Sequence, residues 1–190
     1  MESNASQHLI DTTSRLLEAQ GYHGTGLNQI VRESGAPRGS LYYYFPEGKE
    51  ELAAEAVAGK GQSMGGYTAA TLASRTDAVD AIFSLIDQMA EYIRGNHFCG
   101  GAPLAAVALE TAANSERLRE ACAEAYEEIR RPIMQKLIDG GFPPARAESL
   151  ATTILAAIEG AMILSRTQQS TLPLQHLRFE IGELMRCAST

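Results

Sequence analysis

The stretch from Gly35 to Phe45, which reads Gly-Ala-Pro-Arg-Gly-Ser-Leu-Tyr-Tyr-Tyr-Phe, most constrains what this chain can fold into. It predicts a tight turn followed by a helix that is too short to be stable alone, because isolated helices need roughly 12–15 residues in water. With about 100° between successive residues, Leu41 and Phe45 share one face and point inward. The rest of the chain must therefore provide a core against which this short helix packs.

The opposite face of the predicted short helix carries Gly39 and Tyr43, with Ser40 and Tyr42 on its flanks and Arg38 at its start. An arginine can bond the edge of a guanine in two places, and a glycine lets the backbone come close to a ligand. A face with this composition suits a helix that reads DNA.

A second short helix is predicted just before this one. The pattern from Leu27 to Ser34 places Ile30 and Val31 inward, and Gly35-Ala36-Pro37 makes the turn between the two helices. Helix, short turn, helix is the arrangement of the DNA-binding helix-turn-helix, whose second helix enters the major groove. The two helices together predict a DNA-binding head.

The run from Gly21 to Leu52 resembles the N-terminal signature of the TetR family of transcriptional regulators, and its middle part is similar to the multidrug- and flavonoid-responsive repressor branch. The matching positions are Gly21-Tyr22, Thr25, Ile30, Gly35-Ala36, Gly39, Leu41-Tyr42, Phe45 and Lys49-Glu50-Glu51-Leu52. Three features depart from the pattern. Gly26 stands where a Ser or Thr often caps the second helix, Gln29 replaces a common Asp, and one extra residue precedes Lys49.

The residues that contact DNA are predicted from their positions and from this resemblance. Arg38 is predicted to read a base, and Tyr42 resembles the family's phosphate-contacting tyrosine. The start of the second helix has free N–H groups that attract phosphate, and a phosphate near Lys49 would offset the cost of a cation at a helix start. The full predicted set is Thr25, Gly26, Asn28, Arg38, Gly39, Ser40, Tyr42, Tyr43 and Lys49.

The charge of the chain does not by itself indicate a nucleic-acid binder, because its 190 residues carry a net charge of −7. Between residues 22 and 49, the cations Arg32, Arg38 and Lys49 outnumber the carboxylates Glu33 and Glu47 by one. Attraction to phosphate must therefore come from a few placed cations, backbone N–H groups and helix N-termini.

The sequence predicts a cytoplasmic protein. Its start has neither the basic region nor the apolar segment of a secretory signal. The most apolar long run, Leu150 to Ser165, is interrupted by two threonines and a glutamate, so we expect no membrane span. The cysteines Cys99, Cys122 and Cys187 are an odd number at wide spacing and indicate no disulfide framework.

Helical periodicity continues to the end of the chain, and no stretch alternates at period two long enough to indicate a strand. We therefore predict an all-α fold in which a three-helix head, residues 1–47, is joined by a connecting helix to a ligand-binding and dimerisation bundle, residues 48–190. The expected helices span residues 6–20, 27–34, 38–45, 49 onward, 77–94, 103–113, 115–139, 143–167 and 173–186.

The later part of the connecting helix holds Gly59, Gly61, Gly65 and Gly66. Each glycine costs roughly 1 kcal/mol relative to alanine in a helix. We therefore expect this segment to bend or break easily, either as a loose connector or as a hinge.

The C-terminal part resembles the same regulator branch at Cys99-Gly-Gly-Ala-Pro103, Ala106 to Ala112 and Ala157 to Ala161. Methionine and aromatic residues at helical spacing across four helices suit a cavity for an apolar or aromatic ligand, although each one alone is typical of plain core. The predicted pocket residues are Phe83, Ile86, Met89, Ile93, Phe98, Val107, Glu110, Tyr126, Ile129, Met134, Ile158, Glu159 and Met162. The two glutamates need partners when buried, which are either internal Arg or Tyr side chains or a polar or cationic ligand.

An enzyme is not predicted. Cys99 and His97 are two residues apart, which on a helix do not face each other, and the histidines lack metal-ligand spacing. We expect no catalytic residue, metal or cofactor. Two alternatives stay open: a thiol-based redox-sensing repressor that uses Cys99, and a helical ligand carrier. A carrier that has lost DNA binding would be expected to lack Arg38, Tyr42 or Lys49, and all three are present.

The predicted function is thus a ligand-responsive transcriptional regulator, and specifically a repressor. It would bind a palindromic double-stranded DNA operator as a homodimer and release it on binding a small apolar or aromatic effector. Apolar stripes and the family resemblance place the dimer surface on the last two helices. The predicted interface residues are Ala156, Gly160, Ile163, Leu164, Leu177, Ile181 and Leu184.

Overall fold

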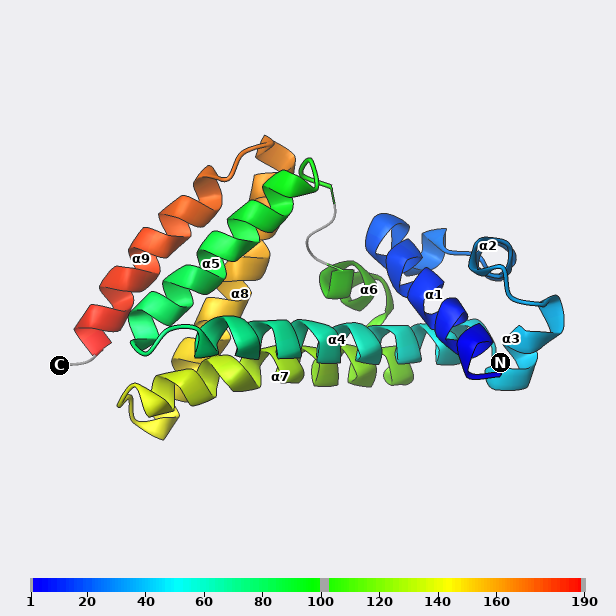
Figure 1. The fold of residues 1–190 in the computed structure, drawn as a ribbon, viewed down its shortest axis with the longest axis horizontal. Coiled ribbons are helices and arrows are strands. Elements are labelled where there is room, and N and C mark those ends of the chain that lie inside the picture. Colours follow the sequence, from blue (N-terminus) through cyan, green and yellow to red (C-terminus); the bar gives the residue numbers. More distant parts are fainter. Residues whose placement is uncertain (1, 100–102, 189–190) are drawn as a thin grey trace. The chain divides into compact units, whose positions relative to one another are not determined.

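The computed structural model describes residues 2–99 and 103–188, apart from the side chains of residues 2–4, 38, 103, 187 and 188. Throughout this part of the chain the regular structure is helical, which confirms the all-α prediction (Figure 1). The helices are α1 (Glu2–Gly24), α2 (Leu27–Ser34), α3 (Arg38–Tyr44), α4 (Lys49–Ala73), α5 (Ala78–Gly95), α6 (Pro103–Thr111), α7 (Glu116–Asp139), α8 (Pro144–Gln168) and α9 (Leu172–Ala188). Residues 100–102 of the C-terminal resemblance lie outside the described residues.

The chain divides into two compact units, each made of two segments. Unit 1 contains Met1–Gln62 and Pro103–Tyr126, and unit 2 contains Ser63–Ala102 and Glu127–Thr190. Unit 1 therefore holds α1, α2, α3 and α6, unit 2 holds α5, α8 and α9, and α4 and α7 contribute to both. The functional boundary expected after residue 47 follows a different line and stays a prediction.

The core of unit 1 holds the helix-turn-helix in place. Leu41 and Phe45, only 1% and 5% exposed, pack with residues of α1, α2 and α4, which confirms their predicted inward position. This core cluster consists of Leu9, Leu16, Ile30, Leu41, Phe45 and Leu52. The helix α6 packs beside α1 within the same unit.

Unit 2 is a helical bundle in which α9 packs against both α5 and α8 (Figure 1). Its core includes Ile82 of α5, Ile133 of α7 and Ile154 of α8, all fully buried. The Lys136 ammonium of α7 donates to the carbonyl oxygens of Arg75 (2.5 Å) and Thr76 (3.1 Å), so it binds the loop between α4 and α5.

Local signals in the sequence interrupt or cap three of the helices. Gly21, with φ 72° and ψ −177°, interrupts α1 next to the predicted end at residue 20. The Asp77 carboxylate caps α5 by accepting from the Asp80 N–H at 2.9 Å. The Ser115 hydroxyl accepts from the Leu118 N–H at 3.1 Å, as predicted for the N-cap of α7.

The glycine-rich part of α4 is not broken, because α4 runs as one helix from Lys49 to Ala73, whereas its expected role as a loose connector or hinge stays a prediction. Two of the glycines allow close packing on the backbone of α7. In unit 1, a Cβ on Gly61 would lie 2.5 Å from the Ala125 Cα, and in unit 2, a Cβ on Gly65 would lie 2.6 Å from the Glu128 carbonyl oxygen. Close contact with α7 therefore explains why Gly61 and Gly65 lack a side chain.

We predicted that the threonines and glutamate of α8 exclude a membrane span. They do not, because by length and composition this helix is apolar enough to cross a membrane. Its packing offers another explanation, because Leu150, Ile154, Ile158 and Met162 lie in the core of unit 2. The core helix of a bundle has the same composition as a membrane-spanning helix.

The two adjacent glycines Gly65 and Gly66 of α4 should respond oppositely to alanine. A Cβ at Gly66 meets no atom within 4 Å, so Gly66→Ala should stabilise the protein by about 0.5–1 kcal/mol through helix propensity. Gly65→Ala should destabilise it by about 1–3 kcal/mol, because backbone must move to admit the methyl group. Urea unfolding of both variants measures the difference. A stabilising Gly65→Ala would contradict close packing on α7.

Candidate functional site

The helix-turn-helix consists of α2, a three-residue turn and α3. Gly35 ends α2 in the left-handed conformation, with φ 67° and ψ 8°, where a side chain would be strained. The Ala36 N–H donates to the Ser34 hydroxyl at 3.2 Å, which closes the turn from the α2 side. The Phe45 N–H donates to the Leu41 carbonyl at 2.7 Å and ends α3. Gly35 and the Ser34–Ala36 hydrogen bond thus shape the turn between the two helices.

The outer face of α3 is exposed as the sequence predicts. Tyr42 and Tyr43 are 62% and 73% exposed, and Gly39 is exposed beside them. Tyr44 instead packs on the head core, and its ring meets that of Tyr43 edge-on at 4.9 Å between centroids. The three consecutive tyrosines therefore divide between a solvent face and a packed face.

Two further predicted contacts flank this face. Ser40 is half-buried on α3, and Asn28 is exposed in the first turn of α2. The side chain of Arg38 lies outside the described ones, although the residue begins α3. Base reading by Arg38 therefore stays a prediction.

At the start of α2, Gly26 leaves the helix without a side-chain cap, whereas the preceding Thr25 is buried and hydrogen-bonded. Gly26 is its N-cap, extended and without a side-chain cap, so the first N–H groups of the helix have no intrahelical acceptor. Thr25 is fully buried, its hydroxyl donates to the Gly21 carbonyl at 2.7 Å, and its N–H donates to the Tyr22 carbonyl at 3.2 Å. This position corrects the predicted phosphate role of Thr25, whose side chain instead closes the turn between α1 and α2.

Lys49 is bound inside unit 1. Its ammonium donates to the Tyr22 carbonyl at 2.7 Å and lies 4.0 Å from the centroid of the Tyr22 ring. Burial lowers the pKa of Lys49, while the charge of Glu110 acts in the opposite direction. The predicted phosphate contact of Lys49 stays a prediction, and it would require the ammonium to leave the Tyr22 carbonyl.

Glu110 of α6 has its partner within the protein. Its Oε2 accepts from the His23 backbone N–H at 2.7 Å. Its carboxylate also lies against Gly21, where an added Cβ would fall 2.0 Å from Oε1. Of the two open interpretations of Glu110, the structure supports an internal partner, although this partner is a backbone N–H and not an Arg or Tyr side chain. The contact ties α6 to the last turn of α1.

Seven of the residues predicted to line the effector pocket come together in the core of unit 2. Ile86, Ile93, Ile158 and Met162 are buried there, and Met89, Phe98 and Met134 pack against them half-buried. Ile129 is also buried in unit 2, whereas Val107, Glu110 and Tyr126 belong to unit 1. The structure thus distributes the predicted pocket residues between the two units.

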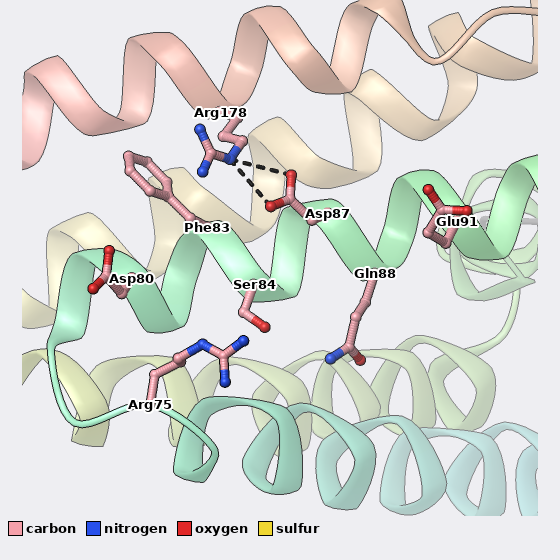
Figure 2. A pocket seen from close by; sticks show the side chains of 8 residues that line it. All are labelled: Arg75, Asp80, Phe83, Ser84, Asp87, Gln88, Glu91 and Arg178. Atoms are coloured by element: carbon pink, nitrogen blue, oxygen red, sulfur yellow. Dashed lines mark hydrogen bonds and ion pairs between the residues drawn. The ribbon is translucent and has the colours of Figure 1, made fainter.

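Phe83 lies apart from that core, beside a surface hollow of about 350 Å³ (Figure 2). The Arg178 guanidinium lies 4.1 Å from the centroid of the Phe83 ring and forms an ion pair with Asp87 at 3.1 Å. Phe83 also packs on Gly182, where a Cβ would fall 2.8 Å from the ring. The ring is therefore part of the α5–α9 contact, a role that periodicity alone did not reveal.

Glu159 of α8 differs from Glu110. Its Oε2 is buried and has no hydrogen-bond partner among the described residues. Burial raises the pKa of Glu159 to about 7. A carboxyl group in this state can donate a hydrogen bond when protonated or hold a cation when ionised.

The cysteines differ in exposure. Cys99 is exposed, and its thiol donates to the His97 carbonyl, with 3.6 Å between sulfur and oxygen. A carbonyl oxygen accepts from a thiol but does not stabilise a thiolate, so this contact does not favour the redox alternative. Cys122 is buried, and burial raises the pKa of its thiol to about 11.

The predicted dimer surface is apolar and exposed on α8. Ile163 and Leu164 are 45% and 50% exposed, and Ala156 and Gly160 are exposed near them. On α9, however, Ile181 is only 3% exposed and lies in the core of unit 2, which corrects its assignment to a surface.

The exposed apolar residues of α9 differ from those that its apolar pattern predicts. Phe179 is 63% exposed and Leu172 is 47% exposed, whereas Leu177 and Leu184 pack half-buried against the core. Of the three residues predicted on α9, Ile181 is thus excluded from the surface, and an interface role of Leu177 and Leu184 stays a prediction.

Two family models match the chain. The model described as bacterial regulatory proteins of the tetR family matches residues 9–56, which include α2 and α3. The model described as the C-terminal domain of LmrA/YxaF-like transcriptional regulators matches residues 78–179. The second match includes α6, which in the structure belongs to unit 1 with the helix-turn-helix and packs on α1.

Relatives match over nearly the whole chain. The HTH-type transcriptional regulator LmrA of Bacillus subtilis is 38% identical over 96% of this chain and 97% of its own length. The uncharacterized regulator YxaF of the same organism is 39% identical over 96% of each chain. A TetR transcriptional regulator from Chloroflexus aurantiacus has a similar structure, with a TM-score of 0.81, 27% identity and coverage of 97% of this chain and 96% of its own. The relatives are named as regulators and not as enzymes, in agreement with the sequence prediction.

Glu159 should make stability depend on pH. Its pKa is raised above the unfolded value, so the folded state binds the extra proton, and stability falls as the pH rises from about 4.5 towards 7. The advantage of Glu159→Gln over the natural chain should grow by roughly 2 kcal/mol between pH 5.5 and pH 8. Denaturant unfolding at both pH values measures this difference, with the exposed Glu148→Gln on the same helix as control. A constant advantage would contradict a raised pKa.

Proposed function

Because the chain belongs to the TetR family of transcriptional regulators and carries an LmrA/YxaF-like C-terminal domain, we propose that it is a repressor that binds a palindromic DNA operator as a homodimer and releases it on binding a small-molecule effector. The observation that carries the proposal is the α2–turn–α3 unit, whose inner face is buried and whose outer face presents Tyr42 and Tyr43. In this proposal the protein acts in the cytoplasm, where occupancy of the operator causes repression and effector binding releases the operator.

Operator contacts are proposed for the outer face of α3 and the start of α2. Arg38 reads a base edge in the major groove, and Gly39 lets the helix come close. Tyr42, Tyr43 and Ser40 contact the phosphate backbone, and the free N–H groups after Gly26 bind a phosphate. In this proposal the base contacts determine sequence specificity, and the phosphate contacts orient the protein on the duplex.

The proposed dimer forms through the exposed apolar surface of α8 and α9, which includes Ile163, Leu164 and Phe179. A two-fold dimer presents two copies of α3 to successive major grooves about 34–36 Å apart. The operator is then palindromic because the protein is symmetric.

The proposed effector is a mainly apolar or aromatic molecule that reaches the Met- and Ile-rich residues of unit 2. The unpaired Glu159 carboxyl suits a cationic group or a hydrogen-bond donor on that molecule. Effector binding releases DNA if the effector prefers a conformation whose two heads are wrongly spaced. Glu110 offers a mechanical link, because it ties α6 to the end of α1 within the head.

Arg38→Ala tests operator recognition. The change should weaken operator binding by about 1–3 kcal/mol per half-site and relax the base preference at one position, because a bidentate base contact is lost. Fluorescence anisotropy with operator variants, found by footprinting of upstream DNA, measures both effects. Arg131→Ala, which removes the same charge from α7, should leave binding unchanged. Equal affinity of Arg38→Ala and the natural chain would rule out base reading by Arg38.

Ile163→Asp and Phe179→Asp test the dimer. Each change places an unpaired charge in the proposed apolar interface and should convert the dimer to monomer in sedimentation equilibrium. Ala145→Asp, at an exposed position in the first turn of α8, introduces the same charge outside the interface and should stay dimeric. If both interface variants remain dimers, the interface lies elsewhere.

A further inference from the structure

A hollow of about 310 Å³ opens between α2 and α3 within unit 1. Its lining residues are Leu27, Asn28, Val31, Gly39, Leu41 and Tyr42. Leu41 is fully buried beneath it, Leu27 and Val31 are half-buried in its wall, and the other three are exposed. Three aliphatic side chains therefore give the hollow an apolar interior that is accessible to a partner.

The hollow continues the surface that the helix-turn-helix presents to DNA. The exposed residues Asn28, Gly39 and Tyr42 belong to the proposed operator contacts, and α3 carries two of them. A Cβ at Gly39 would meet no atom of the protein within 4 Å. The glycine thus leaves open space at the place where α3 would approach the edges of the bases.

The chemistry of the major groove restricts what can fill an apolar hollow. Guanine, adenine and cytosine present hydrogen-bond donors and acceptors, which in the hollow would lose their bound water without gaining a hydrogen-bond partner. A charged phosphate would pay a still larger desolvation cost in the hollow. Thymine alone adds a methyl group, at C5, to its groove edge. The thymine methyl group is therefore the apolar feature of unmodified DNA that matches the hollow.

On the premise that the protein binds an operator as proposed above, we propose that the hollow receives the C5 methyl group of one thymine in each half-site. Leu27 and Val31 then determine specificity through apolar contact, and they require no charge to do so. This contact distinguishes a thymine at one position from every base that lacks the methyl group.

Uracil in place of thymine tests the proposal, because it removes the methyl group and keeps the pairing. Each thymine of the mapped operator is replaced by deoxyuridine, one symmetric pair of positions at a time, and Kd is measured by anisotropy at fixed salt. One pair of positions should lose about fourfold in affinity per half-site, or about fifteenfold for both, as expected for one buried methyl group at about 0.8 kcal/mol. The other thymines should change affinity less than about twofold.

Val31→Thr tests whether the hollow is the origin of this preference. The variant has nearly the same shape but places a hydroxyl in the wall of the hollow, so the ratio of the two affinities, thymine over uracil, should fall several-fold. The ratio is insensitive to a general loss of folded protein, which weakens both duplexes equally. Val79→Thr is the matched control, because Val79 is likewise half-buried against a core but lies in unit 2.

The outcomes separate this proposal from the proposed function. Operator binding with no thymine position sensitive to uracil overturns the methyl contact and leaves the repressor function intact. A sensitive position whose ratio is unchanged in Val31→Thr means that another part of the protein reads the methyl group. Equal weakening of both duplexes by Val31→Thr also leaves the ratio unchanged, so it likewise overturns the role of the hollow. Failure to bind any operator overturns both proposals.

Discussion

The DNA-reading face depends on the burial of Leu41 and Phe45. The helix α3 spans only Arg38–Tyr44, so its own hydrogen bonds cannot keep it folded, and tertiary packing must do so. Each side chain lies in a core contributed by α1, α2 and α4. Because successive residues of an α-helix are about 100° apart, holding Leu41 and Phe45 inward also fixes the directions of Gly39, Tyr42 and Tyr43. The same packing therefore stabilises the head and orients the face that is proposed to contact DNA.

The head is also tied to a helix that the family comparison places in the C-terminal domain. Glu110 of α6 accepts from the His23 N–H, and its carboxylate occupies the space that a Cβ on Gly21 would take. Lys49 binds the carbonyl of the intervening Tyr22. The last turn of α1 is thus held by an acid from α6 and a base from α4. A displacement of α6 would act on the same backbone segment that positions the start of α2.

The sequence predicted the head better than the bundle, for a physical reason. The ends of α2 and the inward side of α3 follow from local signals, which are a glycine in the left-handed conformation and a 3.6-residue apolar period. The packing of Gly61 and Gly65 on α7 depends on a partner helix that is distant in sequence, so the glycine pattern alone does not predict it.

The same limit applies to particular side chains. The apolar residues of α9 lie on more than one side of the helix. Periodicity alone therefore does not predict that Ile181 faces the core while Phe179 faces solvent. Thr25 and Lys49 carry the polar groups that a phosphate contact would use, but the structure gives both groups backbone acceptors within the head. Hydrogen-bond partners of this kind depend on three-dimensional proximity, which a pattern of residue types does not encode.

The acidic character of the chain has a consequence for how it would select an operator. With a net charge of −7 and few cations near α3, the release of counterions from DNA contributes less to affinity than in a strongly basic protein. We therefore expect binding to arbitrary DNA to be weak, because such binding depends mainly on counterion release. Affinity for the operator must come instead from short-range contacts, which are base edges, backbone N–H groups and apolar surface. A protein of this kind gains selectivity from the scarcity of its positive charge.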